Sequence, residues 1–404
     1  MYFIQEIFDK VYWVGVNDRR IERFENMFLL KKGVAYNSYL IRDEKTLLMD
    51  CVDGNFAQQF LDNVEGALDG RDLDYLVVNH MEPDHCGTIK FILNKYPNCK
   101  FVGNKKTFQF FEQFYDGDYS DRYYEVKEND EINIGSHNFK FVFAPMVHWP
   151  EVMMVYETNN SYLFSADAFG AFDAHEGSLF AKDYYKRDNW INEARRYYIN
   201  IVGKHGNMVM NVFKKIENLP IKAIMSLHGP VYSDEESINF ILDKYKTWAS
   251  FKPEKKGVLI AFSSMYGNLA LASDILANEL SKLGVTDISM FDVSNTDYGY
   301  IISDAHKYSH AVFTPMNYNA ELYPKMDALL RELVSTGYKN RHISLLNSWS
   351  WCGNSLKIAQ DILSKGNHTY VGDVVKIKSS VKEENLSEIK ALAKAIKEDM
   401  DSLD

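Results

Sequence analysis

Four short runs of strand-forming residues in the first half of the chain each end beside a side chain that can bind a metal. The runs and the residues that follow them are Leu73–Asn79 with His80, Phe139–Ala144 with His148, Ser161–Ala166 with Asp167, and Ile221–Leu227 with His228. Because the carboxyl ends of neighbouring strands meet at one rim in layered α/β folds, we expect these side chains to converge. The pattern therefore predicts an α/β fold with a ligand cluster at that rim.

The segment after the first of these runs adds three potential ligands, with the sequence His80-Met81-Glu82-Pro83-Asp84-His85. We expect a short irregular loop here, because Pro83 and Gly87 favour tight turns. The full set has four imidazoles and three carboxylates, too many for one ion. Two divalent ions with Asp167 as a bridging carboxylate would use all of them. Since the set lacks thiolates, it favours non-haem iron, or manganese, over structural zinc.

A polar segment with Pro253 and Gly257, spanning residues 249–257, separates this half of the chain from a second half with a different pattern of strands and helices. We predict two domains, residues 1–250 and 256–404. In the second, strand-like and helical runs alternate, which indicates a parallel α/β sandwich. The expected strands are Val258–Phe262, Ala311–Thr314 and His342–Asn347, and the expected helices are Leu269–Leu283, Lys325–Ser335 and a terminal amphipathic helix from Lys382 to Asp404. In the first domain we expect a helix over Asp188–Val202.

Three loops follow the strands of the second half and would face one edge of its sheet. The first carries hydroxyls and a glycine before a helix, which suits a phosphate but is also typical of an ordinary strand-to-helix turn. Flavodoxin-like sheets bind FMN at this edge, and two tryptophans of the third loop are placed to flank a flavin ring. The candidate FMN contacts are Ser263, Ser264, Met265, Tyr266, Gly267, Asn268, Thr314, Pro315, Met316, Asn317, Asn319, Ser348, Trp349, Ser350, Trp351, Cys352 and Gly353.

The composition narrows the class of partner. A net charge of −11 without a long Lys/Arg block disfavours nucleic acid and anionic membranes as partners. The first residues do not resemble a signal peptide, and no apolar run reaches the ~20 residues that span a bilayer, so we expect a cytoplasmic protein. The four cysteines form no Cys-x-x-Cys pair. We assign no role to His137, His205, His306, His310, His342 and His368, which lack carboxylates in a comparable pattern.

The ligand run and its surroundings resemble the flavodiiron proteins over almost the whole chain. The matching segments are His80-x-Glu82-x-Asp84-His85, Met146-Val147-His148-Trp149-Pro150, Asp167-Ala168-Phe169-Gly170 and His228-Gly229-Pro230. The resemblance implies a metallo-β-lactamase-like αββα sandwich followed by a flavodoxin-like doubly wound sheet. It also implies that one iron is bound by His80, Glu82 and His148, the other by Asp84, His85 and His228, and both by Asp167. Glu82 stands where the zinc hydrolases of that fold carry a histidine, which favours redox chemistry over hydrolysis.

The flavin half departs from the family pattern in two of its loops. Ser263 and Leu269 stand where the family often has Asp and Thr. In the third loop, Ser350, Cys352 and Asn354 replace glycines. These changes affect the expected FMN contacts and the flavin potential.

The resemblance implies that the chain reduces O2 to water, NO to N2O, or both, as detoxification in an anaerobe, with FMN re-reducing two irons. Electrons would come from a separate donor such as rubredoxin or its reductase, a deazaflavin or an NAD(P)H-linked carrier. It further implies a head-to-tail homodimer or a dimer of dimers. His175 or a nearby tyrosine is a candidate proton donor. Two alternatives stay open: a metallo-β-lactamase-type hydrolase with a flavodoxin appendage, and an FMN electron carrier with a vestigial metal site.

Overall fold

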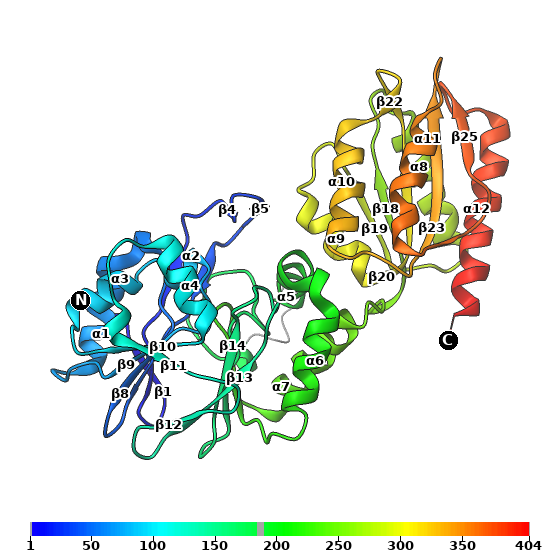
Figure 1. Cartoon of the computed structure of the whole chain (residues 1–404). Helices are drawn as coiled ribbons and strands as arrows, with labels where there is room; N and C mark the ends of the chain where they lie inside the picture. Colours follow the sequence, from blue (N-terminus) through cyan, green and yellow to red (C-terminus); the bar gives the residue numbers. More distant parts are fainter. Residues whose placement is uncertain (1, 184–189, 404) are drawn as a thin grey trace. The chain divides into compact units, whose positions relative to one another are not determined.

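The computed structural model describes residues 2–183 and 190–403 (Figure 1). The chain forms two compact units, Met1–Tyr245 and Lys246–Asp404. The division falls inside helix α7 (Glu235–Ala249), just before the polar segment in which the sequence predicts a domain boundary. No helix in the described ranges is both long and apolar enough to cross a membrane.

The first unit is built on two sheets. Seven strands form one of them within the described residues, in the order β1 (Gln5–Phe8), β2 (Val11–Trp13), β7 (Tyr39–Arg42), β8 (Thr46–Met49), β9 (Tyr75–Val77), β10 (Lys100–Gly103) and β11 (Tyr123–Glu125). Its pairs are antiparallel up to β8 and parallel from β8 to β11. The second sheet has six described strands, in the order β12 (Glu131–Asn133), β13 (Asn138–Phe143), β14 (Met153–Glu157), β15 (Tyr162–Phe164), β16 (Ala223–Met225) and β17 (Val231–Tyr232).

The core of this unit lies between the two sheets. Buried side chains of the first sheet, such as Leu47 and Val77, belong to one hydrophobic cluster with Phe139, Val155 and Met225 of the second. Helices cover the outer faces of both sheets, as Figure 1 shows for α1 and α3 on one side and for α6 and α7 on the other. The predicted αββα sandwich is confirmed.

The helices of this unit follow from local sequence signals. In α1 the buried residues Phe60, Val64 and Leu68 recur every four residues, so one face packs on the sheet. The helices are α1 (Ala57–Leu68), α2 (Pro83–Cys86), α3 (Ile89–Lys95), α4 (Lys105–Phe114), α5 (Trp190–Tyr197) and α6 (Gly206–Ile216), with short segments η1 (Gly54–Phe56), η2 (Ser120–Arg122), η3 (Ala181–Asp183), η4 (Tyr198–Val202) and η5 (Gly203–His205).

The helix predicted over Asp188–Val202 corresponds to α5 followed by the π-helical turn η4, whereas Asp188 and Asn189 lie outside the described residues. Two short ribbons complete the unit, namely β3 (Val16–Asp18) with β6 (Val34–Tyr36), and β4 (Arg23–Phe24) with β5 (Phe28–Leu29).

The second unit contains one parallel sheet. Its described strands run in the order β19 (Ile288–Asp292), β18 (Lys255–Phe262), β20 (Tyr308–Thr314), β23 (His342–Trp349) and β24 (Thr369–Tyr370), with β25 (Val375–Lys378) also paired to β23. Every pair is parallel, and the central strand β20 is buried along its whole length, as expected for a sheet covered on both faces. The chain leaves β18 for β19 on one side and returns to β20 on the other, which creates a switch point.

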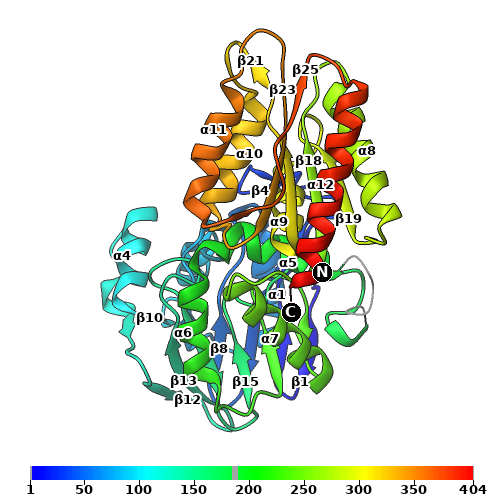
Figure 2. The same cartoon turned by 90° about the vertical axis from the view of Figure 1, so that its right-hand side faces the viewer.

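Helices cover both faces of this sheet. They are α8 (Asn268–Lys282), α9 (Tyr298–Lys307), α10 (Pro324–Ser335), α11 (Ser355–Leu363) and α12 (Glu383–Ser402), with the short elements η6 (Ser364–Gly366), β21 (Asn317–Tyr318) and β22 (Glu321–Leu322). Figure 2 shows α10 and α11 on one face and α8 and α12 on the other. This arrangement confirms the predicted doubly wound, flavodoxin-like sheet.

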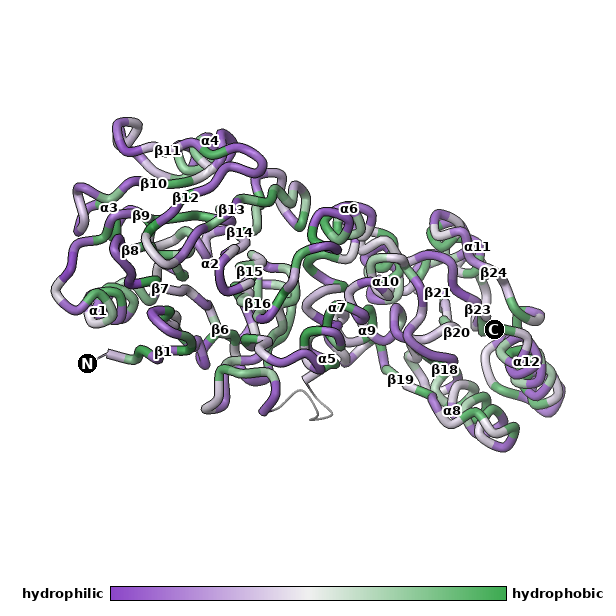
Figure 3. Tube along the Cα trace, turned by 90° about the horizontal axis from the view of Figure 1, so that it is seen from below, coloured by the Kyte–Doolittle hydropathy of each residue, from purple (hydrophilic) through white to green (hydrophobic). Residues whose placement is uncertain are grey.

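The predicted terminal helix is present as α12. Its buried residues Ile389, Leu392, Ile396 and Met400 follow a helical period. Hydrophobic and hydrophilic stretches accordingly alternate along its turns in Figure 3. The helix packs one face on the unit and leaves the other to solvent.

Candidate functional site

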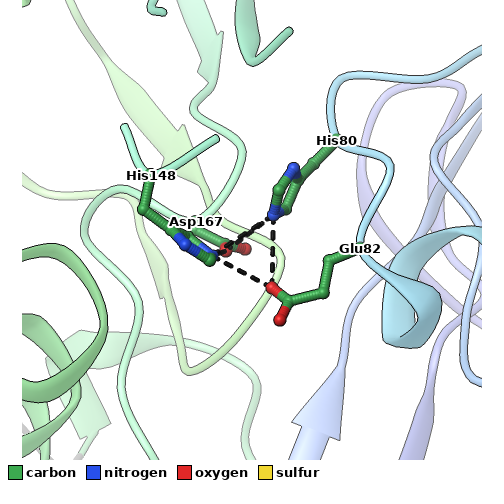
Figure 4. A group of neighbouring side chains, drawn as sticks. All are labelled: His80, Glu82, His148 and Asp167. Carbon is green, nitrogen blue, oxygen red and sulfur yellow. Dashed lines mark hydrogen bonds and ion pairs between the residues drawn. The ribbon is translucent and has the colours of Figure 1, made fainter. Parts of the chain in front are cut away.

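The seven predicted metal ligands lie together in the first unit as two neighbouring groups. His80, Glu82, His148 and Asp167 form one (Figure 4). In it, Glu82 Oε2 lies 3.3 Å from His80 Nε2 and 3.0 Å from His148 Nε2. Asp167 Oδ2 lies 3.4 Å from His80 Nε2 and 3.1 Å from His148 Nε2. Two imidazoles and two carboxylates therefore face one small volume.

The second group consists of Asp84, His85 and His228. The Nε2 atoms of the two histidines are 2.9 Å apart, and Asp84 Oδ2 lies 3.4 Å from that of His85 and 3.2 Å from that of His228. Asp167 turns its other oxygen, Oδ1, toward this group, 3.2 Å from His85 Nε2. One carboxylate therefore presents one oxygen to each group, which is the position of a bridge.

Four ligands come after strands, and the other three lie at the start of helix α2 or within it. His80 comes after β9, His148 lies between β13 and β14, Asp167 comes after β15, and His228 lies between β16 and β17. The two sheets of the sandwich thus both contribute ligands.

The prediction of an irregular loop after His80 is wrong. Residues Pro83–Cys86 form the short helix α2, with Pro83 at its first turn. The fixed φ of proline suits that position, and Gly87 also has a helical φ of −57°. Gly87 is required for a different reason, because a Cβ there would lie 2.5 Å from the backbone nitrogen of Gly54.

The donor set fits two cations. The carboxylate oxygens of Asp84 and Asp167 are buried and accept no well-formed hydrogen bond from the described residues. Burial alone would raise the pKa of Asp167, yet the imidazoles of His80 and His85 hold that pKa well below its ordinary value. Buried carboxylates that stay ionised need compensating positive charge, and the facing Nε2 atoms of His85 and His228 can share only one proton. One metal ion in each group would satisfy both requirements.

Groups that the sequence did not single out hold the histidines in place. Glu151 Oε1 lies 2.8 Å from His80 Nδ1 and also accepts the backbone N–H of Met81. His228 Nδ1 lies 2.8 Å from the carbonyl oxygen of Ala35. When Nδ1–H donates to such an oxygen, the lone pair of Nε2 points to the cluster. Glu151 lies 71 residues after His80, so no local spacing in the sequence pointed to this pair.

Asp50 is a second carboxylate that the sequence did not single out. It accepts hydrogen bonds from the backbone N–H and the side-chain amide of Asn79, at 2.7 and 2.8 Å. Burial raises the pKa of Asp50 to about 7. Because Asp50 directly follows the apolar strand β8, its place at a strand end resembles that of the predicted ligands.

His175 lies behind the cluster rather than in it. Its Nε2 is 2.9 Å from Asn37 Oδ1, and Asn37 donates its amide to the carbonyls of Ser226 and Gly229 on either side of His228. Asn37 Oδ1 is an acceptor, so the Nε2 of His175 carries the proton. Burial lowers the pKa of His175 to about 4. The imidazole is therefore neutral at pH 7 and positions the His228 loop.

Aromatic rings enclose the His228 side of the cluster. The rings of Phe24, Tyr36 and Tyr197 lie 5.3, 5.8 and 5.3 Å from that of His228, measured between centroids. The hydroxyl of Tyr197 is buried without a hydrogen-bond partner in the described parts of the chain. The rings form an aromatic wall on this side of the cluster, and Tyr197 brings to it a buried hydroxyl without a well-formed hydrogen bond to the described residues.

A cavity of about 310 Å³ lies at the carboxyl ends of the strands in the second unit. Twelve of the predicted FMN contacts line it, namely Ser264, Met265, Tyr266, Asn268, Met316, Asn317, Asn319, Ser348, Trp349, Ser350, Trp351 and Cys352. Residues that the prediction omitted also line it: Leu269, Tyr318, Ala320 and Ser379. The predicted contacts that do not line it are Ser263, Gly267, Thr314, Pro315 and Gly353.

Ser263 and Thr314 have a structural reason to stay out of the cavity. Ser263 donates its backbone N–H to Thr314 Oγ1 at 2.9 Å and its hydroxyl to the Thr314 carbonyl at 3.1 Å. Both side chains are fully buried, so they join β18 to β20 below the cavity floor. The loop between β18 and α8 is left to present its backbone, with Gly267 in the left-handed region at φ 87°.

The cavity also fits a polar aromatic ligand. The buried Asn317 Nδ2 has no hydrogen-bond partner within the described ranges, although it belongs to a lining residue. Tyr266 and Trp351 at the rim are 88% and 80% exposed, which leaves large aromatic surfaces free to pack on a ring. The α8 N-terminus at the same cavity suits a phosphate.

Comparisons with known proteins agree on one family. Residues 34–229 match the model described as ODP family beta lactamase. The anaerobic nitric oxide reductase flavorubredoxin of Vibrio vulnificus is 30% identical over 354 residues, which cover 86% of this chain and 70% of that protein.

Two solved structures share the fold over nearly their full length. The rubredoxin oxygen:oxidoreductase of Desulfovibrio gigas has a TM-score of 0.93 at 22% identity and covers 99% of both chains. The flavodiiron protein of Giardia intestinalis has a TM-score of 0.92 at 23% identity, over 100% of this chain and 98% of that one. With two ligand groups in the sandwich and a cavity at the switch point of the sheet, the chain belongs to the flavodiiron family of oxidoreductases.

Proposed function

We propose that this protein reduces O2, NO or both at a di-iron centre, with electrons delivered through FMN bound in the second unit. The observation that carries the proposal is the position of Asp167, whose two oxygens face separate groups of histidines and carboxylates. The names of the Vibrio vulnificus relative, a nitric oxide reductase, and of the Desulfovibrio gigas protein, an oxygen:oxidoreductase, support these two substrates.

In this proposal His80, Glu82 and His148 hold one iron, and Asp84, His85 and His228 hold the other, with Asp167 shared. When bound, two ferrous ions and a flavin hydroquinone supply together the four electrons that convert O2 to water. Glu82 contributes an anionic oxygen where an imidazole would favour a softer site, which suits iron in its oxidised state.

The chain's own residues prepare this site in three ways. Glu151 and the Ala35 carbonyl fix the tautomers of His80 and His228, so that both present Nε2 lone pairs inward. The aromatic wall around His228 keeps bulk water out. Tyr197, whose ring packs on His228 and whose hydroxyl has no partner among the described residues, would donate a hydrogen bond to a reduced oxygen atom, a role that His175 cannot take because its proton is held by Asn37.

We further propose that residues 256–404 are the FMN-binding domain and residues 1–250 the di-iron domain. The twelve predicted contacts that line the cavity would hold the flavin, with Trp349 and Trp351 near its ring and the α8 N-terminus near its phosphate. Ser263, Gly267, Thr314, Pro315 and Gly353 would shape the loops from outside the cavity.

Rubredoxin or its reductase is the leading electron donor, ahead of a deazaflavin or an NAD(P)H-linked carrier, since the Desulfovibrio gigas protein is named for rubredoxin. The working assembly is a head-to-tail homodimer or a dimer of dimers. A reducing, cytoplasmic location agrees with the four cysteines, which are all unpaired.

A metal and gas assay tests this function. Protein purified without oxygen should contain about two irons and one FMN per chain, and its reduced form should consume O2 or NO at an electrode. Two zinc ions in place of iron would instead support a hydrolase, and FMN without metal would support an electron carrier. If the reduced, metal-loaded protein consumed neither gas, the proposal would be wrong.

A further inference from the structure

A third cluster of ligand-type side chains lies in the second unit, at the amino-terminal ends of the strands, opposite the flavin cavity. It consists of His310 on β20, His342 at the start of β23 and Asp399 on α12. The two histidines are direct partners in the parallel pairing of β20 with β23. Because Asp399 is supplied by a helix far along the chain, the sequence pattern left both histidines without an apparent carboxylate.

The three side chains converge on one carboxylate oxygen. Asp399 Oδ2 lies 2.9 Å from His310 Nε2 and 2.5 Å from His342 Nδ1. The two imidazole rings are 5.0 Å apart between centroids. All three ligand atoms lie within 4.8 Å of one another, a spacing that small shifts would open to hold one ion.

The hydrogen bonds around His310 leave its inner nitrogen available. Its Nδ1 lies 2.8 Å from Ser309 Oγ, and that hydroxyl is placed to donate to the Gly257 carbonyl at 3.4 Å. In one tautomer His310 Nδ1–H donates to Ser309 and the Nε2 lone pair is free for an ion, whereas in the other Nε2–H donates to Asp399 Oδ2 at 2.9 Å. Binding of an ion selects the first tautomer. Metal-binding histidines are commonly held by such an outer hydrogen bond.

His342 also turns a nitrogen toward Asp399, but it lacks a well-formed hydrogen bond there. Its Nδ1 is buried and forms no hydrogen bond in satisfactory geometry with any described residue, although the Asp399 carboxylate is close to it. Both nitrogens therefore face one carboxylate oxygen. An ion that displaces their protons would take two nitrogen lone pairs and one anionic oxygen as ligands.

We propose that His310, His342 and Asp399 bind one divalent transition-metal ion of the zinc type, which joins α12 to β20 and β23. Two imidazoles and a carboxylate suit zinc and its first-row neighbours, whereas calcium and magnesium require more oxygen donors. The side chains of His342 and Asp399 are 22% and 26% exposed, so an ion can enter and keep a solvent ligand. This site is separate from the seven-residue cluster and stands independently of the gas chemistry.

Zinc titration of the iron-loaded, FMN-bound protein tests the site. A chromophoric chelator should report one zinc ion per chain beyond the irons, while metal analysis shows that the iron stays in place. His342→Ala and Asp399→Asn should each weaken this zinc binding by at least about tenfold. Asp399→Asn is the sharper variant, because the amide oxygen still accepts a hydrogen bond from His310 but has lost its charge.

Two matched controls and a second readout complete the test. His205→Ala removes an imidazole elsewhere, and Asp401→Asn removes an exposed carboxylate from the same helix; both should bind zinc as the wild type does. Zinc should raise the thermal midpoint of the wild type and of the controls but not that of the two site variants. Absence of zinc binding beyond the iron sites, or wild-type zinc affinity in Asp399→Asn, would overturn the proposal.

Discussion

The metal cluster of the first unit and the cavity of the second are built on opposite physical principles. The cluster brings charged and basic side chains together where they are buried, as Asp167, His80 and His228 are completely. The cavity is bordered by exposed aromatic rings and by loop backbone, with Tyr266 and Trp351 mostly in solvent. Buried charges tolerate few substitutions, whereas backbone N–H groups are available whatever the side chain. Residue identity is therefore strongly constrained in the cluster and weakly constrained at the cavity.

The largest effect is expected for Asp167→Ala, which tests whether the cluster is the more strongly constrained of the two sites. Because both ligand groups lose the same carboxylate, we expect activity to fall by more than the roughly 100-fold that loss of an outer-shell partner produces. Iron content should fall with it, while FMN stays bound. Gas consumption and metal analysis measure the effect, with Asp62→Asn, which changes a partly exposed carboxylate on α1 that bonds to Gln58 at the surface, as the control. Retained activity would contradict the bridging role.

The second largest effect concerns the pH dependence of stability in the first unit. Burial lowers the pKa of His175 to about 4, below the ordinary histidine value. Between those two values the unfolded chain binds a proton that the folded chain does not, so stability falls as the pH drops through about 6.5 to 4 and levels off below. The contribution is about 3 kcal/mol.

Denaturant unfolding of metal-free protein at pH 7 and pH 4.5 measures this effect. His175→Gln should lose less stability on acidification than the wild type does. Equal slopes for the two proteins would show that His175 is not the group that titrates.

Glu151→Ala should have the third largest effect, a loss of about 10- to 100-fold in metal affinity or activity. The reason is that His80 loses the acceptor that fixes its tautomer. Glu151→Gln, which keeps an oxygen for the same hydrogen bond, should recover part of the loss. If the two variants were equally impaired, the charge of Glu151 rather than the orientation of His80 would be responsible.

The smallest effect is expected at the cavity. Trp351→Ala removes one exposed ring and should weaken FMN binding by only about 2- to 13-fold, the equivalent of 0.5–1.5 kcal/mol. Fluorescence titration of FMN measures the change, with Tyr370→Ala as the control for an exposed aromatic residue outside the cavity lining. Iron content should not change. Complete loss of FMN would mean that side chains rather than backbone dominate this site as well.

Much of the site could be predicted because its signals are local. Each ligand stands within four residues of the end of a strand-forming run or within the segment from His80 to His85, so neither sheet packing nor loop geometry was needed to find it. The cavity was predicted less well. Ser263 and Thr314 were expected in loops that contact FMN, but they hydrogen-bond to each other and join β18 to β20. The short helix α2 was missed because proline favours a first helical turn as well as an irregular loop.

The residues alone predicted the seven ligand-type side chains and the parallel sheet of the second unit, because strand periodicity and strand ends are properties of neighbouring residues, whereas the αββα sandwich of the first unit was implied by the family resemblance. The three-dimensional structure was needed to show which oxygen of Asp167 faces which group, which carboxylate holds His80, and that Asp399 meets His310 and His342. These relations join residues from different sheets, or from a sheet and a helix. Their distances depend on strand register and on the packing of layers, and no short stretch of the sequence determines either.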